Sequence, residues 1–182
     1  GTKREPEPQT PFGGKAWAIP GKIEMEDFDE PGYGNGNDSY ADNDDANHSC
    51  TDEGKEAECS EYRKGTPVDI YKKATGNVVG YNQAGEWLEY TVNVKEAGDY
   101  TVFASVATGN TTAGFKLSID GESVGEVAVS GSSWDEFTKV KANVTLPAGE
   151  HILRFEVTGD WFDIDYMQFV AGKDAEEPGK GR

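Results

Sequence analysis

The sequence predicts an all-β protein, a β-sandwich of jelly-roll type built from two antiparallel sheets. Short segments alternate apolar and polar side chains, which is the period of half-buried strands. Gly, Asn, Asp and Pro cluster between these segments and supply the chemistry of turns. No segment sustains the 3.6-residue period of an amphipathic helix. Many short strands joined by tight turns are typical of sandwiches and jelly rolls.

Eight segments carry the clearest strand pattern. In chain order they are residues 21–28, 87–94, 99–107, 114–120, 123–129, 137–146, 151–159 and 161–170. The pair Asp120-Gly121 predicts a tight hairpin, because Gly tolerates the positive φ that such a turn demands. The two sheets are expected to bury a common set of apolar side chains, with the candidates Val102, Phe103, Phe115, Leu117, Ile152, Leu153 and Phe155.

Length and charge limit the function classes. The chain has 182 residues, which suits one ordinary globular domain. Its 17 Lys and Arg residues stand against 34 Asp and Glu residues and give a formal net charge of −17 at pH 7. Such a surface repels phosphate backbones and anionic lipid head groups, so neither nucleic acid nor a membrane is an expected partner.

Both ends of the chain carry Pro, Gly and charged residues without apolar periodicity, a composition typical of linkers. We therefore expect a tether at residues 1–20, one β-sandwich domain at residues 21–171 and a linker at residues 172–182. A domain with tethers on both sides is usually one unit of a longer protein. Inside the domain, residues 32–66 form a long polar loop, and loops of this length tend to be functional or disordered.

Cys50 and Cys59 lie in this polar loop. Because no core would shelter them there, we expect a disulfide between them, which favours an oxidising, extracellular setting and a secreted protein. A pair of free thiols in a flexible loop is the alternative. Zinc is not expected, since no His or Cys partners stand at ligand spacing.

The residue inventory argues against an enzyme. The chain has two histidines, His48 and His151, so a Ser-His-Asp or Cys-His unit has few residues to draw on. Paired carboxylates of the glycosidase type are the remaining enzymatic alternative, and they need a deep cleft that a single small sandwich rarely provides.

Carboxylates at two places are candidates for binding Ca²⁺, a hard cation that prefers oxygen ligands. Glu24 and Glu26 are one residue apart, so in a strand their side chains leave the same face. Like charges this close are destabilising unless a cation or a basic residue lies between them. The second place is the acidic cluster at residues 42–47, for which a solvated loop is the alternative.

Three aromatic residues stand in or beside Gly-rich or Ser-rich turns, namely Tyr81, Trp134 and Trp161. Exposed rings held by rigid loops are the usual platform for sugar rings, whose C–H faces stack on them. Packing against the core is the alternative for each ring.

Four segments, in this order, resemble the carbohydrate-binding modules of family 6. They are IEMEDF, VVGYNQAGEWLEYTVNV, SSWDEF and FDIDYMQF, and the resemblance spans residues 23–170. It implies a non-catalytic β-sandwich jelly roll appended to a secreted bacterial polysaccharide-degrading enzyme, a glycoside hydrolase or esterase. The implied partner is a neutral polysaccharide or oligosaccharide of xylan, β-glucan or agarose type. We expect a monomeric module covalently linked to its catalytic domain.

The resemblance also implies ligand-binding residues. Family members grip a sugar ring between two aromatic residues, and these positions match Tyr81 and Trp134. The family's Asn at the start of the last strand is replaced here by Asp163. Asn both donates and accepts hydrogen bonds, whereas an ionised Asp only accepts. The substitution either changes which hydroxyl is recognised or weakens or abolishes binding in this cleft.

The family's structural calcium gives a second set of residues. Its two glutamates match Glu24 and Glu26, its last-strand acidic residue matches Asp165, and a backbone carbonyl near Tyr62 or Arg63 is expected to complete the shell. Asp42 and Asp44 match acidic positions in the agarase and glucanase branch of the family.

The segment between the cysteines looks like an insertion beside the expected cleft. It could wall the cleft, shape its specificity or block it. Two rival functions therefore remain: a protein-interaction or adhesion module with a blocked sugar cleft, and a small glycosidase or lyase.

Overall fold

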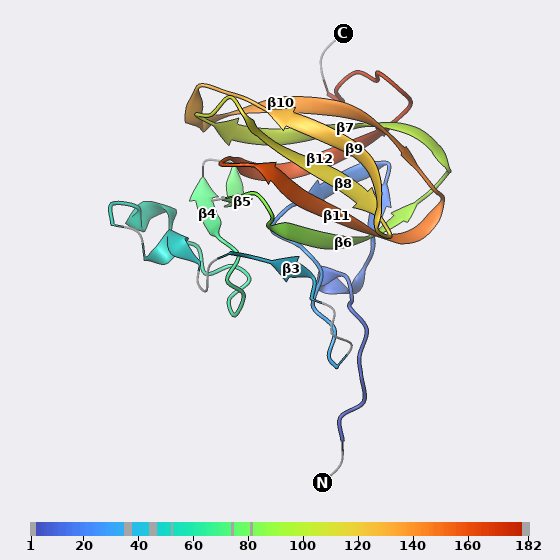
Figure 1. Cartoon of the computed structure of the whole chain (residues 1–182), viewed down its shortest axis with the longest axis horizontal. Helices are drawn as coiled ribbons and strands as arrows, with labels where there is room; N and C mark the ends of the chain where they lie inside the picture. The colour runs from blue at the N-terminus through green and yellow to red at the C-terminus, as the bar shows by residue number, and fades with distance from the viewer. Residues whose placement is uncertain are drawn as a thin grey trace.

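The structure is a computed structural model, and it describes residues 3–34, 38–43, 47–51, 53–73, 75–80 and 82–179. Two sheets form a sandwich (Figure 1). The first sheet contains β1 (Trp17–Ile19), β3 (Tyr40–Ala41), β6 (Trp87–Val94), β8 (Ala113–Ile119), β9 (Glu122–Val129) and β11 (Gly149–Gly159). The second contains β2 (Gly21–Glu24), β4 (Ile70–Lys73), β5 (Gly76–Val79), β7 (Gly98–Thr108), β10 (Ser133–Leu146) and β12 (Asp163–Ala171). Short 3-10 helices η1 (Phe12–Gly14), η2 (His48–Cys50) and η3 (Glu56–Glu58) lie in the connections.

The strand order is that of a jelly-roll sandwich, which confirms the predicted fold class. In the first sheet the order is β1-β6-β11-β8-β9, and in the second it is β10-β7-β12-β5-β4. From β6 onward the chain passes from one sheet to the other at almost every connection, which is typical of jelly rolls. Among the described pairs, β1 with β6 is the parallel exception to an otherwise antiparallel arrangement.

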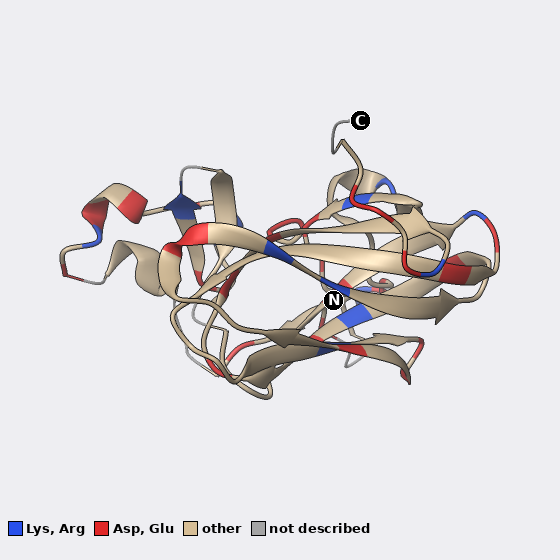
Figure 2. Cartoon of the chain, turned by 90° about the horizontal axis from the view of Figure 1, so that it is seen from above, with Lys and Arg blue, Asp and Glu red and all other residues tan. Residues whose placement is uncertain are grey.

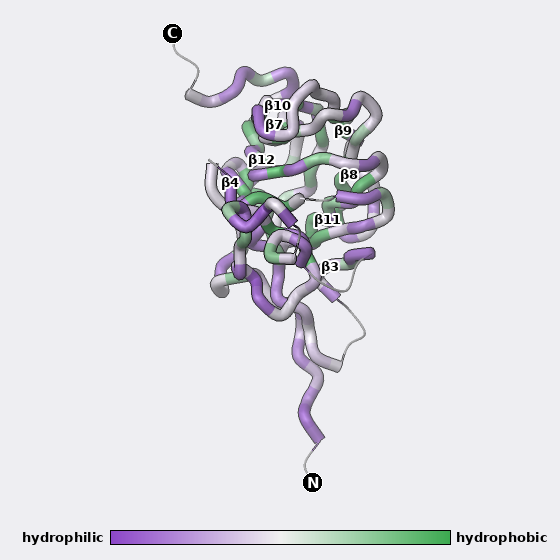
Figure 3. The backbone as a smooth tube through the Cα atoms, turned by 90° about the vertical axis from the view of Figure 1, so that its left-hand side faces the viewer, coloured by the Kyte–Doolittle hydropathy of each residue, from purple (hydrophilic) through white to green (hydrophobic). Residues whose placement is uncertain are grey.

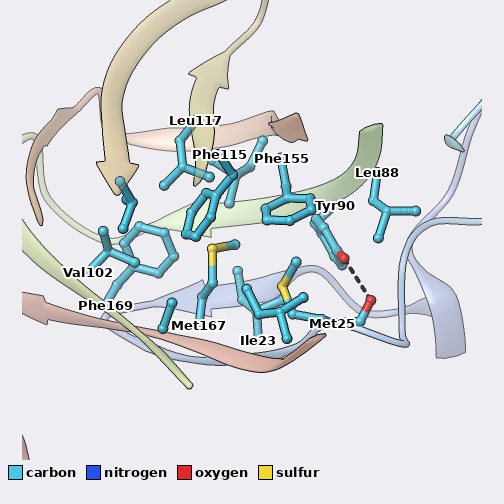
Figure 4. Close-up of a cluster of buried hydrophobic side chains, with 14 of the residues drawn as sticks. Ile23, Met25, Leu88, Tyr90, Val102, Phe115, Leu117, Phe155, Met167 and Phe169 are labelled. Carbon is cyan, nitrogen blue, oxygen red and sulfur yellow. Dashed lines mark hydrogen bonds between the residues drawn. The ribbon is translucent and has the colours of Figure 1, made fainter. Parts of the chain in front are cut away.

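Side chains from both sheets meet in one core, which Figure 4 shows in close-up. Phe115 and Phe155 are at most 1% exposed, and their ring centroids lie 4.8 Å apart. The Tyr90 hydroxyl donates a hydrogen bond to the Met25 carbonyl at 2.6 Å, so the polar end of this buried ring is also satisfied. The hydrophobic stretches of the backbone in Figure 3 accordingly follow the strands.

Six of the seven predicted core residues are buried, and Ile152 is the exception. It is half-buried on the outer face of the first sheet, because Leu153 takes the inward position in β11. Val102 and Phe103 are adjacent in β7 and face opposite ways, yet both are buried. On the outer face, the register places Phe103 between Lys141 and Gln168, whose long side chains flank it.

The predicted hairpin at Asp120-Gly121 is present between β8 and β9, where Ile119 pairs with Glu122. Asp120 and Gly121 have φ values of 48° and 89°. Positive φ at both central residues is the geometry of a type I′ turn, which matches the twist of the flanking strands.

Both chain ends pack on the sandwich beyond the predicted domain boundaries. β1 lies within the predicted N-terminal tether, yet it pairs with β6 and its Ile19 is fully buried. In the predicted C-terminal linker, the Gly172 carbonyl accepts a hydrogen bond from the Thr101 hydroxyl at 2.8 Å. Further along, Glu177 forms an ion pair with Lys139. A three-residue strand is too short to show an apolar period, and the C-terminal contacts involve backbone and charged groups, so the sequence pattern reveals neither.

The long polar loop is organised around a disulfide between Cys50 and Cys59, as predicted. The flanking residues Ser49 and Ser60 are buried, and the Ser60 amide donates to the Ser49 hydroxyl at 3.2 Å. Cys59 also pairs with Tyr71 of β4 through an isolated bridge. The loop therefore projects beside β4 (Figure 1), and it carries both acidic and basic residues (Figure 2). Within the described residues, no helix has the length and apolar composition needed to cross a membrane.

We expect the double substitution Cys50→Ser/Cys59→Ser to lower the free energy of unfolding by about 2–3 kcal/mol, because it frees a short closed loop in the unfolded state. Guanidinium denaturation of the two proteins measures the difference. Reducing agent should lower the stability of the unmodified chain to a similar extent and leave the double variant unchanged. Equal denaturation midpoints for the oxidised chain and the variant would contradict the prediction.

Candidate functional site

A cleft of about 330 Å³ opens where the loop ends of the second sheet meet the disulfide-bonded loop. Its lining comes from several segments. Strand β4 contributes Tyr71 and Lys73, and β10 contributes Trp134. The β11–β12 connection contributes Trp161 and Phe162, β12 begins with Asp163, and the disulfide-bonded loop contributes Lys55. Aromatic walls with a few convergent charged groups are the usual make-up of a binding site for a small molecule.

Trp134 forms the most exposed wall of the cleft. Its side chain is 45% exposed, and the pairing of β10 with β7 is irregular between Ser133 and Thr138, which lifts this residue out of the regular ladder. The indole packs over Gly109, where an added Cβ would lie 2.6 Å from Nε1. A side chain at position 109 is therefore incompatible with this indole position.

Asp163 and Lys73 form the polar floor of the cleft. The Lys73 ammonium forms an ion pair with Glu58, and its Nζ lies 3.3 Å from Asp135 Oδ1 and 3.8 Å from Asp163 Oδ2. Both side chains are largely buried, with exposures of 10% for Lys73 and 14% for Asp163. The floor thus joins an ammonium to three carboxylates from three separate segments.

The protonation states of Lys73 and Asp163 place a hydrogen-bond donor beside an acceptor in the cleft floor. Burial raises the pKa of Asp163 to about 6, a shift that the neighbouring Lys73 ammonium opposes. Burial disfavours the charged form of Lys73, but the hydrogen bond to Glu58 and the charge of Asp163 outweigh it and raise the pKa of Lys73. At neutral pH the cleft therefore presents an ammonium next to a largely ionised carboxylate.

Gly80 allows Tyr71 and Asp163 to approach each other at the end of β5. An added Cβ at this position would lie 2.8 Å from Tyr71 Cδ1 and 2.9 Å from Asp163 Oδ1. Such distances are shorter than real Cβ contacts, so the absence of a side chain here is a geometric requirement of the cleft.

The structure brings together two of the three predicted ligand-binding residues. Trp134 and Asp163 line the same cleft, whereas Tyr81 lies outside the described residues. Sequence reasoning missed Tyr71 and Lys73, because no strand was predicted at residues 70–73. Lys55 lines the cleft from the disulfide-bonded loop, so the described part of this loop walls the cleft and leaves it open.

The three predicted carboxylate ligands also come together. Oxygen atoms of Glu24, Glu26 and Asp165 lie within 4.8 Å of one another. β2 ends at Glu24, so Glu26 lies in the following turn rather than in a longer strand as predicted. The Met25 amide continues the pairing with β12 by donating to the Asp165 carbonyl at 3.0 Å, which keeps both glutamates beside Asp165.

Burial and mutual repulsion destabilise the ionised carboxylates of this cluster, and the charge of Lys22 offsets this only in part. Burial raises the pKa of Glu26 to about 8, and the negative charge of Glu24 adds to the shift. Burial likewise raises the pKa of Glu24 and of Asp165. Glu26 Oε1 is buried and has no hydrogen-bond partner among the described residues. A divalent cation would supply the missing partner and favour the ionised carboxylates.

The other residues predicted to take part in metal binding have different surroundings. The Arg63 carbonyl accepts hydrogen bonds from the Thr66 amide at 3.2 Å and the Thr66 hydroxyl at 3.0 Å. Within the described chain, Asp42 is not part of the three-carboxylate cluster and lines a small cavity with Asn82. Asp44 lies outside the described residues.

A second concavity, of about 780 Å³, lies on the outer face of the first sheet. Trp87 of β6 lies in it, but the Arg154 guanidinium covers that ring at 3.8 Å from its centroid. Arg154 Nε donates to Glu89 Oε2 at 2.8 Å, which holds the guanidinium in place. One face of the Trp87 indole is thus covered by the side chain of Arg154.

A β-sandwich that carries an open aromatic cleft at the loop end of one sheet defines a binding module. Comparisons with known proteins give its family. The family model described as "Carbohydrate binding module (family 6)" matches residues 56–171. The chain belongs to this family of non-catalytic carbohydrate-binding modules.

Relatives of known sequence are agarases. The chain is 31% identical over 110 residues to an alpha-agarase of Alteromonas agarilytica. This match covers 57% of this chain and 8% of the relative. It is 30% identical over 103 residues to the beta-agarase AgaA of Microbulbifer thermotolerans. This match covers 52% of this chain and 24% of the relative. The chain therefore spans a quarter or less of these enzymes.

Solved structures share the fold. The family 6 module CsCBM6-3 of Clostridium stercorarium, in complex with cellobiose, superposes with a TM-score of 0.63 at 19% sequence identity. The match covers 87% of this chain and 99% of that module. At this identity the likeness supports the β-sandwich fold alone.

We expect Gly109→Ala to displace the Trp134 indole and to weaken carbohydrate binding without unfolding the protein, because the new methyl group would overlap the ring. Retention in polysaccharide affinity gels and Trp fluorescence emission measure the two effects. The melting temperature is the control for folding. Unchanged emission together with unchanged retention would show that the indole does not rest on Gly109.

Proposed function

We propose that the cleft binds a neutral polysaccharide chain or oligosaccharide and that the module thereby brings a linked glycoside hydrolase to its substrate. The observation that carries the proposal is the exposed Trp134 indole beside the polar floor of Asp163 and Lys73. The indole offers an apolar face for the C–H side of a sugar ring, and the floor offers a donor and an acceptor for its hydroxyls.

The charge around the cleft supports a neutral sugar. Glu58, Asp135 and Asp163 surround the Lys73 ammonium, so a sulfate or uronate group would meet more negative than positive charge. The agarases among the relatives favour a polysaccharide of agarose type, with β-glucan and xylan as further candidates.

The context of the module is part of the same proposal. The agarase relatives contain the matching segment within much longer chains, which supports covalent linkage to a catalytic domain. The disulfide supports an extracellular location. A monomer is expected. The open cleft favours sugar binding over the rival role of a protein-interaction module with a blocked cleft.

We expect Trp134→Ala to weaken binding roughly thirtyfold or more, because truncation of a central aromatic contact typically costs about 2 kcal/mol or more. Affinity gels with soluble xylan, mixed-linkage β-glucan, laminarin and agarose, followed by calorimetry on the best polysaccharide, measure the loss.

Tyr33 is a matched control, since its side chain is 44% exposed and does not line the cleft. Tyr33→Ala should bind as the unmodified chain does. If Trp134→Ala keeps full affinity, the sugar site is not this cleft.

We further propose that Glu24, Glu26 and Asp165 hold a structural Ca²⁺. Two oxygens that bind one calcium ion at about 2.4 Å can lie at most about 4.8 Å apart, which agrees with the spacing of this cluster. The unpartnered Glu26 Oε1 is the position that a cation would satisfy. Calcium bound there would join β2 to β12 and neutralise the repulsion among the three carboxylates.

We expect a chelator to lower the melting temperature of the unmodified module, because the cation stabilises the folded state by binding it selectively. Glu26→Gln should melt at a lower temperature in calcium and lose the response to chelator. Glu122→Gln, an exposed carboxylate outside the cluster, should keep that response. A melting temperature that chelator leaves unchanged in the unmodified chain would contradict the calcium proposal. Differential scanning calorimetry at matched ionic strength provides the measurement.

A further inference from the structure

We propose that Lys73 is a ligand-binding residue that determines the sugar specificity of the cleft, and that Glu58 of the disulfide-bonded loop positions it. The inference rests on the carbohydrate-binding function proposed above. Lys73 donates a hydrogen bond to one hydroxyl of a neutral pyranose while Asp163 accepts one from the neighbouring hydroxyl of the same ring.

The distance between the two groups supports this arrangement. Lys73 Nζ and Asp163 Oδ2 are 3.8 Å apart, which is an ion-pair distance but too long for a hydrogen bond. The two groups therefore do not hydrogen-bond to each other, and both can bind a ligand. Neighbouring hydroxyls of one pyranose are close enough together to engage both groups at once.

The other contacts of Lys73 hold the ammonium at the cleft floor. Glu58 of η3 pairs with it from one side, and Asp135, next to Trp134, lies 3.3 Å away. An ammonium has three N–H donors, so one remains for a ligand when these two carboxylates are engaged. Lys55 lies 3.6 Å from the same Glu58 and helps to fix its carboxylate.

The polar pair of Lys73 and Asp163 is suited to supply specificity. A stacking surface such as Trp134 accepts the C–H face of many different sugars, whereas a buried hydrogen-bonding group rejects a sugar that leaves it unpaired. Lys73 is 10% exposed, so a bound sugar that leaves its third N–H donor without a partner would be disfavoured. The position and axial or equatorial orientation of two neighbouring hydroxyls are then what the cleft distinguishes.

The test compares Lys73→Gln with Lys72→Gln, the exposed lysine next to it on β4. The probes are xylan, mixed-linkage β-glucan, laminarin and agarose in affinity gels, and oligosaccharides of the best of these in calorimetry. We expect Lys73→Gln to lose about tenfold or more in affinity and to change the order of preference among the four probes. Lys72→Gln should bind unchanged, and Lys73→Arg should recover part of the affinity because it keeps the charged donor.

Two different failures can be told apart. If Trp134→Ala loses binding while Lys73→Gln keeps both its affinity and its order of preference, the specificity role of Lys73 is wrong and the sugar cleft stands. If the unmodified chain retains none of the four polysaccharides, the proposed function and this inference fail together.

The positioning role of Glu58 is tested by a double-mutant cycle. Glu58→Gln should weaken binding in the unmodified background and have no further effect in the Lys73→Gln background, because the two residues act through one ammonium. An equal loss in both backgrounds would show that Glu58 acts independently of Lys73. Melting temperatures of all four proteins exclude unfolding as the cause of a lost affinity.

Discussion

The register of β12 is the constraint on which both candidate sites depend. This strand lies inside the second sheet, with β7 along one side and β2 and β5 along the other. Ile164, Met167 and Phe169 of β12 are buried in the core, and the register against β7 shifts by one residue between Ile164 and Tyr166. Because of this shift, Asp163 lies at the cleft and Asp165 lies beside Glu24 and Glu26. In a regular strand, both carboxylates would share the face of Met167 and Phe169 and point into the core, where unpaired charge is not tolerated.

The two carboxylates on β12 differ in how much positive charge the chain places beside them. Asp163 has Lys73 as a counter-charge supplied by the chain itself. Asp165 lies beside two glutamates. Burial raises its pKa, and a hydrogen bond with Thr75 and the charge of Lys22 offset that shift only in part. A chain with a net charge of −17 has few basic residues to neutralise buried acids. The calcium ion proposed above would supply the missing positive charge to the cluster that contains Asp165.

The sequence predicted the sandwich well where strands are long and alternate regularly, as in β8 and β11. It did not predict β4 and β5, which have four residues each and follow a long polar loop without a periodic pattern. Tyr71 and Lys73 were missed for this reason. Trp134, Asp163 and the three clustered carboxylates were found because they belong to local motifs, whereas the contacts of Lys73 join segments far apart in the sequence.

The disulfide-bonded loop gives the cleft a wall that the sandwich alone does not provide. The strands fix the positions of Trp134 and Asp163, but Glu58 and Lys55 come from outside the sheets. A short covalently closed loop has little conformational entropy left to lose, so its charged side chains are presented to the cleft at low cost. Specificity in such a module can then change through a few loop residues while the two sheets keep their packing, because binding residues on loops are less coupled to the core.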